Sequence, residues 1–316
     1  MTRKHLATLL LLTVGTLAAR AQQDVQYAQF THDKLNFNPA YAGAKGGPTV
    51  GLIARAQWVG YEGAPVSQAL RAHIPLEDTR VGLGLTLDND VIGFGRSTSI
   101  KAAYSYRLQL SRELMLNLGF DAAIRQTRLD YTEARREDLL DPTLTEEPVS
   151  TRYLPNVGLG GFLYARRFYV GLSMPRIARN LIFAPEDGRI TGLSREERHT
   201  YLMAGVDLPA SRNVRFRPAL NVKYAPNAPL NIDLNAMTVL HDVLAVGGTY
   251  RAGGLNSAVE PVSADFIVQV MPRKELTIGM AYGHPLSSLG GQQAGSFEVL
   301  LEYTFIRPRR IRCYYF

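Results

Sequence analysis

Hydrophobic and polar residues alternate along most of the chain from Thr49 onward. A period of two places apolar side chains on one face of a β-strand and polar ones on the other. In residues 113–125, one face carries Leu114, Leu116, Leu118, Phe120, Ala122 and Ile124. The opposite face carries Asn117, Gly119, Asp121 and Arg125. Residues 214–224 and 230–235 show the same alternation, so we predict an all-β fold.

Fourteen such segments follow one another along the chain. Several have about 9 to 11 residues, which is the length that a tilted strand needs to cross a bilayer. We expect strands at residues 49–58, 66–74, 81–88, 97–107, 113–126, 153–165, 167–174, 199–208, 214–224, 230–240, 243–251, 262–270, 274–283 and 295–306.

The connections between these strands alternate in length. Short ones follow every second strand, at residues 75–80, 108–112, 166, 209–213, 241–242 and 271–273. Most of the others are longer, notably residues 127–152, 175–198, 252–261 and 284–294. Outer-membrane barrels combine an even strand number with short periplasmic turns and long outer loops. A soluble β-sandwich would share the alternating strands but has no reason to alternate its loop lengths.

Strands in lipid must satisfy all their backbone hydrogen bonds among themselves, so they have to close into a barrel. Aromatic residues near the expected strand ends are typical of the interfacial girdles of such barrels. They are Trp58, Tyr61, Tyr104, Tyr106, Tyr153, Tyr201, Tyr224, Tyr250, Tyr282 and Tyr303. We predict an integral antiparallel β-barrel over residues 49–306, in the outer membrane of a Gram-negative bacterium.

The first 21 residues show the features of a secretory signal peptide in the right order. Arg3 and Lys4 precede an apolar stretch at residues 6–19, and residues 19–21 read Ala-Arg-Ala, a typical cleavage site. The apolar stretch has about 14 residues, fewer than the roughly 20 of a membrane-spanning helix. Cleavage after residue 21 would lower the formal net charge from +7 to +4.

Residues 22–48 lie between the signal peptide and the first expected strand. Pro39 disfavours a helical conformation at Asn38, and Gly43, Gly46 and Gly47 permit tight backbone turns. We therefore predict a non-helical segment that lies at the periplasmic mouth of the barrel or enters the lumen as a partial plug. Sealing or bracing the barrel base is the favoured role, and direct binding of a partner is the alternative.

The last ten residues, 307–316, form a basic tail that we expect in the periplasm. It contains Arg307, Arg309, Arg310 and Arg312. A solvated tail or one that contacts lipid phosphates is the favoured interpretation, and a docking peptide for a periplasmic partner is the alternative.

The sequence carries no motif for catalysis or for binding a cofactor, and we expect neither activity nor a metal. It lacks the patterns G-x-S-x-G, H-E-x-x-H, G-x-x-x-x-G-K-[ST] and paired C-x-x-C. Its histidines are dispersed without ligand spacing. Basic residues are scattered rather than clustered with aromatics, which argues against nucleic-acid binding. Cys313 is the only cysteine, so no internal disulfide can form.

The polar face of the expected strands is rich in charge, with cations in excess. Its charged members are Arg55, Arg71, Lys101, Arg107, Asp121, Arg125, Arg215, Arg217, Lys223, Asp233 and Asp265. This face would line the lumen. One interpretation is an anion-preferring pore, because interior charge tunes selectivity. The other is a rigid, salt-bridged interior, and the sequence leaves both open.

Four short stretches carry a resemblance to a known family. They are residues 26–30 (QYAQF), residues 36–43 (NFNPAYAG), residues 55–58 (RAQW) followed by residues 63–65 (GAP), and residues 89–93 (NDVIG). Together these motifs, all within residues 22–95, resemble the amino-terminal part of the PorP/SprF family, and the strand rhythm extends the resemblance over the whole length. The residues around Asp90 and Gly93 also have the composition of a turn, which we favour over a calcium site because too few oxygen ligands are present.

The resemblance implies a non-enzymatic outer-membrane component of the type IX secretion system and, in some members, of gliding motility. Its implied partners are a secreted adhesin or other cargo, periplasmic components of that system, and outer-membrane lipid. The candidate partner-binding residues are Asn38, Pro39, Tyr41, Gly43, Trp58, Asp90, Gly93, Arg307, Arg309 and Arg310. The alternative function, which a barrel permits equally well, is a porin-like or ligand-specific transporter.

Overall fold

The computed structural model describes residues 25–76, 79–130, 149–150, 153–181, 196–226, 228–253, 261–286 and 294–305. The predicted signal peptide (residues 1–21) and the predicted basic tail (residues 307–316) lie outside the described residues. Large parts of the two longest predicted loops, residues 131–148 and 182–195, also lie outside them.

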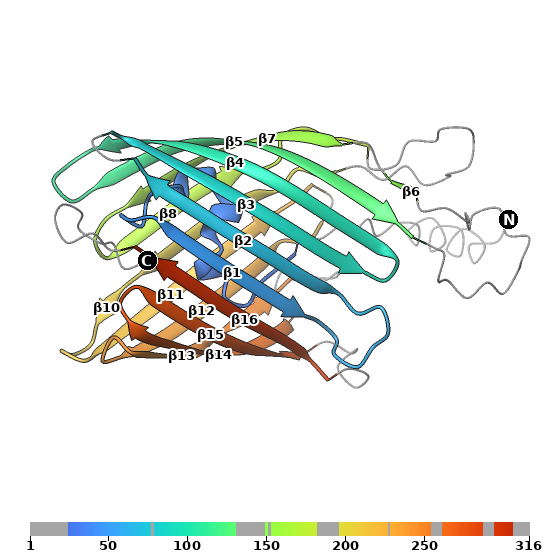
Figure 1. Cartoon of the computed structure of the whole chain (residues 1–316). Coiled ribbons are helices and arrows are strands. Elements are labelled where there is room, and N and C mark those ends of the chain that lie inside the picture. Colours follow the sequence, from blue (N-terminus) through green and yellow to red (C-terminus); the bar gives the residue numbers. More distant parts are fainter. Residues whose placement is uncertain are drawn as a thin grey trace, which may run out of the picture.

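Fourteen strands of seven residues or more form the wall of a barrel (Figure 1). They are β1 (Thr49–Ala56), β2 (Val66–Pro75), β3 (Val81–Ile92), β4 (Gly95–Gln109), β5 (Met115–Leu129), β7 (Leu154–Tyr164), β8 (Phe168–Met174), β9 (Thr200–Val206), β11 (Val214–Tyr224), β12 (Asn231–Leu240), β13 (Leu244–Ala252), β14 (Pro261–Arg273), β15 (Leu276–Pro285) and β16 (Ser296–Thr304). Two strands of two residues each, β6 (Val149–Ser150) and β10 (Leu208–Pro209), pair with β5 and β11.

Each strand of the wall pairs antiparallel with its neighbours, and the sheet closes on itself. The first and last strands meet in the register Thr49↔Thr304 to Ala56↔Phe297. Strand β9 pairs with β11, with Gly205 opposite Ala219. The sheet therefore has no free edge, and the predicted fourteen-stranded antiparallel barrel is confirmed.

The side chains alternate between the two faces of the wall as the sequence pattern predicts. Along β1 every second residue is buried, and the intervening Leu52 is 50% exposed. Phe266 is 57% exposed and Met280 63%, although both are large and apolar. An apolar outer face on a barrel with a charged interior fits lipid and not water. The chain is an integral outer-membrane protein.

Among the described residues, no helix is both long and apolar enough to cross a bilayer.

Six of the short connections lie at the same end of the barrel. Those after β2, β4, β7, β10, β12 and β14 are short and lie at one end, which we call the short-turn end. The opposite end, the long-loop end, holds the β1–β2 connection and the two-residue β3–β4 turn, and β5, β8, β13 and β15 end there. We assign the short-turn end to the periplasm, as in other outer-membrane barrels.

Several strand ends differ from the prediction. Strand β3 continues to Ile92, so Asp90 lies in a strand and not in a turn, and only Gly93 belongs to the turn. The prediction was wrong there because the strand pairing with β4 extends beyond the apolar pattern, up to Ile92↔Gly95. Strand β1 ends at Ala56, and Trp58 lies in the following loop with a φ of 49°.

The segment before β1 lies inside the barrel and contains short helical turns, η1 (Phe30–His32), α2 (Lys34–Phe37) and η2 (Pro39–Tyr41) (Figure 1). The prediction of a non-helical segment was therefore wrong. The proline rule holds only locally, because Asn38 is extended with φ −138° and ψ 111°. Pro39 then begins η2 at a position where a missing N–H costs nothing.

We expect Met280→Arg to lower the stability of the barrel by about 2–4 kcal/mol, because a charge at the middle of a lipid-facing strand is costly. Urea unfolding in lipid vesicles would measure the change. Val59→Arg, at an exposed loop position, is the control and should change stability little. Equal effects of both variants would contradict the assignment of the lipid face.

Candidate functional site: the plugged lumen

Residues 25–47, which we call the plug, cross the lumen from the long-loop end to the short-turn end. Near its beginning, the carbonyl oxygen of Gln26 accepts a hydrogen bond of 2.8 Å from Nη1 of Arg55, close to the loop end of β1. At its other end, Gly47 lies against the carbonyl oxygen of Phe305, just after β16. The chain thus enters the lumen at the end opposite to the one where β1 begins.

The first part of the plug binds the wall through its backbone. The carboxylate of Glu298 accepts hydrogen bonds from the backbone N–H groups of Ala28 (2.7 Å) and Gln29 (2.9 Å). Arg55 lies 3.5 Å from the same carboxylate. The hydroxyl of Thr249 donates to the carbonyl oxygen of Ala28 at 2.8 Å. These contacts satisfy buried peptide groups that have no water to bind.

The second part of the plug is held in the same manner by the opposite wall. The amide of Asn38 donates to the carbonyl oxygen of Gly161 at 2.9 Å, and its oxygen caps η2 by accepting from Ala40 at 2.9 Å. Asn117 donates to the carbonyl oxygen of Ala40 at 3.0 Å. Three further wall side chains donate to plug carbonyls: Ser105 to Ala42, Arg107 to Gly43 and Ser173 to Phe37.

Glycines in the wall make room for the plug. A Cβ atom on Gly160 would lie 2.1 Å from Oδ1 of Asn38, and one on Gly119 would lie 2.4 Å from the backbone nitrogen of Ala40. On Gly82 it would lie 2.2 Å from the carbonyl oxygen of Ala42. Any larger residue at these positions would push the plug away from the wall. The strand glycines thus have a packing role.

Ion pairs link the charged groups of the lumen. Asp33 of the plug pairs with Arg71, which also lies 2.5 Å from Asp88. Other lumenal pairs are Arg55–Asp265, Arg251–Asp233, Lys223–Asp233, Arg217–Asp207, Arg125–Glu196 and Lys45–Glu302. These ion pairs support the salt-bridged interior, one of the two interpretations of the charged face. Removing one member of a buried pair typically costs about 3–5 kcal/mol.

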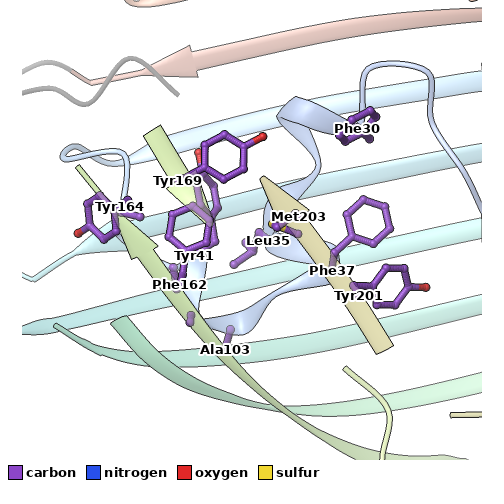
Figure 2. Packing of buried hydrophobic residues seen from close by; sticks show 13 residues of the cluster. Phe30, Leu35, Phe37, Tyr41, Ala103, Phe162, Tyr164, Tyr169, Tyr201 and Met203 are labelled. Atoms are coloured by element: carbon purple, nitrogen blue, oxygen red, sulfur yellow. The ribbon is translucent and has the colours of Figure 1, made fainter. Parts of the chain in front are cut away.

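An aromatic cluster fixes the middle of the plug against β7, β8 and β9 (Figure 2). Tyr41 packs edge-on against Phe162 with ring centroids 5.3 Å apart. Phe37 packs against Tyr201 at 5.0 Å. These buried rings add apolar contacts to the hydrogen bonds, so the plug has both polar and hydrophobic anchorage.

The plug divides the lumen into two cavities of about 350 Å³ each. The outer vestibule opens toward the long-loop end and is lined by Val25, Asn36, Asp90, Arg125, His199 and their neighbours. The inner vestibule opens toward the short-turn end and is lined by Lys34, Lys45, Arg217, Met237, Lys274 and their neighbours. The two cavities share no lining residue, and the plug lies between them.

Hydrogen bonds hold the beginning of the loop after β8 against Asn156 in the wall of the outer vestibule. The amide oxygen of Asn156 accepts from the backbone nitrogens of Ile177 and Ala178, both at 3.0 Å. Its nitrogen donates to the carboxylate of Glu196 at 2.9 Å, and Glu196 lies 3.3 Å from Arg125. The described ends of this loop therefore narrow the outer mouth of the barrel.

Four of the predicted partner-binding residues come together in the plug. Asn38, Pro39, Tyr41 and Gly43 are all buried between plug and wall. Gly43 has a φ of 71°, and its N–H donates to Nδ1 of His73 at 3.3 Å. These residues attach the plug, which fits the sealing role that we favoured over direct partner binding.

The other predicted residues do not lie with these four. Trp58 is 44% exposed in the β1–β2 loop. Asp90 is half-buried and accepts a hydrogen bond from the hydroxyl of Ser67, while Gly93 lies in the β3–β4 turn, where its N–H donates to Gly63. Arg307, Arg309 and Arg310 lie outside the described residues.

The sequence analysis missed the wall residues that hold the plug, among them Glu298, Thr249, Asn117 and Ser105. A signal was present, because all four occupy inward positions of their strands. Nothing in the local sequence shows which backbone groups they would meet. Among the described residues, no group of three or more His, Cys, Asp or Glu residues could hold a metal ion.

A family model described as the type IX secretion system membrane protein PorP/SprF matches residues 19–303. No curated protein sequence matches the chain. Among solved structures, the CymD monoaromatic hydrocarbon channel is 14% identical with a TM-score of 0.49, covering 89% of this chain and 94% of that one. A Pseudomonas aeruginosa FadL homologue is 10% identical with a TM-score of 0.49, covering 85% and 93%. Acinetobacter baumannii Omp33 is 7% identical with a TM-score of 0.47, covering 82% and 98%.

Gly160→Val should displace Asn38 and lower the free energy of unfolding by about 1–3 kcal/mol, because the added atoms overlap the plug. Gly161→Val is the matched control. A Cβ there would meet nothing nearer than Leu118 at 3.9 Å, on the outer face. Urea unfolding followed by circular dichroism would measure both variants. Equal stability of the two would contradict the close fit between plug and wall.

The path of the plug predicts from which side of the membrane a reagent can reach Val25, the first described residue of the plug. In a background with Cys313→Ser, we expect Val25→Cys to react with a membrane-impermeant maleimide on intact cells. Arg212→Cys, in the short β10–β11 connection, should react only after the outer membrane is permeabilised. The reverse pattern would show that the barrel or the plug runs in the opposite direction.

Proposed function

The chain belongs to the PorP/SprF family of type IX secretion system membrane proteins, and from this membership we propose that it works as a non-enzymatic binding component of that system. In this role it would bind a secreted surface protein, such as an adhesin, at its outer face or periplasmic components of the system at its inner face. A role in gliding motility would follow if the bound protein is a motility adhesin.

The observation that carries the proposal is the plug. Hydrogen bonds, ion pairs and aromatic contacts hold residues 26–43 against both sides of the wall. Passage of a solute would require these contacts to break together. We therefore infer that the barrel acts through its two faces rather than through its lumen.

The outer face carries exposed aromatic side chains that suit a protein partner. Trp58 is 44% exposed, Tyr61 59% and Phe94 47%. The loops that carry them are joined, because the N–H of Gly93 donates to the carbonyl oxygen of Gly63 at 2.9 Å. Tryptophan and tyrosine are enriched among the residues that dominate binding energy at interfaces. We therefore propose that this loop pair is a contact site for the secreted partner.

A gated transporter is the second candidate function. It is favoured by the two vestibules, which leave only the plug between the two sides of the membrane. Planar-bilayer recordings of the purified chain separate the candidates. Silence supports the binding component, whereas steady conductance or solute-induced opening supports the transporter.

We expect a tagged chain, purified from gently solubilised outer membranes, to retain type IX components or a secreted surface protein, identified by mass spectrometry. Trp58→Ala combined with Tyr61→Ala should reduce recovery of the secreted partner about tenfold or more, because aromatic anchors of this kind contribute at least 2 kcal/mol. Arg212→Ala, exposed at the other end, is the matched control. A lone barrel in several mild detergents, or equal recovery with both variants, would count against the proposed outer contact site.

A further inference from the structure

The inner vestibule combines a cationic wall with an apolar surface. Its lining includes five basic side chains, Lys34, Lys45, Arg215, Arg217 and Lys274. The carboxylates in the lining are Asp242, Glu275 and Glu302. A concave site lined mainly by one sign of charge concentrates ions of the opposite sign.

The nearest carboxylates are already shared between cations. Glu302 contacts both Lys45 and His32. Asp207, behind the lining, contacts both Arg215 and Arg217. Asp242 of the lining also contacts Arg215, so three of the five cations already have carboxylate partners.

Among the described residues, two cations of the lining, Lys34 and Lys274, form no ion pair, and of these two only Lys34 is buried. It is 3% exposed and contacts no carboxylate among the described residues. Its ammonium group donates to the carbonyl oxygen of Thr31 and lies 4.9 Å from the ring centroid of Tyr169 and 5.4 Å from that of Tyr41. An ammonium group can donate three hydrogen bonds, and Lys34 uses one of them for Thr31. The ammonium group can therefore still donate strong hydrogen bonds to a bound anion.

Apolar side chains line the same cavity beside this group. They include Met237, Val239, Ala245 and Met271, together with the ring of Tyr169. Methionine side chains adapt to ligands of varied shape. A volume of about 350 Å³ is enough for a small organic molecule and much more than a single inorganic ion needs.

We propose that the inner vestibule binds an organic carboxylate with an apolar or aromatic body, with the carboxylate beside Lys34 and the body against the methionines. The carboxyl end of a polypeptide and a short fatty acid share this chemistry. The rim, with the exposed Asp242 and Lys274, leaves the site open toward the periplasm. This site is independent of the outer contact site proposed above.

The protonation of Lys34 gives a readout that is specific to the site. Burial lowers the pKa of Lys34 to about 7. The groups that face it are Lys45 and Arg217, which lower this pKa, Glu302, which raises it, and the histidine ring of His73. A bound carboxylate would raise the pKa again, so binding near pH 8 should take up a proton.

The full chain in nanodiscs of zwitterionic lipid should bind N-acetylphenylalanine, measured by isothermal titration calorimetry. N-acetylphenylalaninamide, octanoate and inorganic phosphate are the comparison probes. Lys34→Met keeps the size of the side chain and should weaken binding of the carboxylate about tenfold or more and abolish proton uptake. Arg212→Gln, exposed at the same end but outside the vestibule, is the control and should bind as the original chain does.

Tight binding of the acid and not of its neutral amide supports the site. Tighter binding of N-acetylphenylalanine than of octanoate then indicates the carboxyl end of a polypeptide as the natural ligand. Tighter binding of octanoate indicates a fatty acid. Equal binding of acid and amide, equal binding by Lys34→Met and Arg212→Gln, or binding of inorganic phosphate as tight as that of the organic acids would overturn the proposal. The proton count, taken from titrations in buffers of different ionisation enthalpy, distinguishes contact with Lys34 from adsorption at the surface.

Discussion

In the apolar core of a membrane no water is present to bind peptide groups, and the architecture of this protein depends on that constraint. Antiparallel pairing satisfies the wall only when the sheet closes, which it does between β1 and β16 and between β9 and β11. A ring of fourteen strands encloses more space than its own inward side chains fill. The amino-terminal segment fills the remainder, and its peptide groups need partners for the same reason.

The wall supplies those partners with buried polar side chains that point into the lumen. Glu298 serves two peptide N–H groups, while Asn117, Ser105 and Thr249 serve carbonyl oxygens. Close approach is possible because the adjacent wall positions are glycines. Plug and wall are therefore parts of one packed interior. In this arrangement the two vestibules of the lumen lie on opposite sides of the plug.

Because the plug fills much of the lumen, we expect binding surfaces at the two ends of the barrel. The long-loop end presents Trp58, Tyr61 and Phe94 on joined loops. The short-turn end presents a cationic hollow around Lys34. Membership of the type IX secretion family agrees with a barrel that binds proteins at its faces, and the inner vestibule adds a site for a smaller anionic group.

The strand number, the antiparallel barrel and the inward position of residues such as Arg55 and Asp233 were determined by the sequence itself. A period of two decides locally which side chains share a face, whatever the rest of the chain does. The path of the plug, the end of β3 beyond Asp90 and the open or closed state of the lumen were decided only by the tertiary structure. Their contacts join residues such as Ala28 and Glu298, which are 270 positions apart, so no local pattern specifies them.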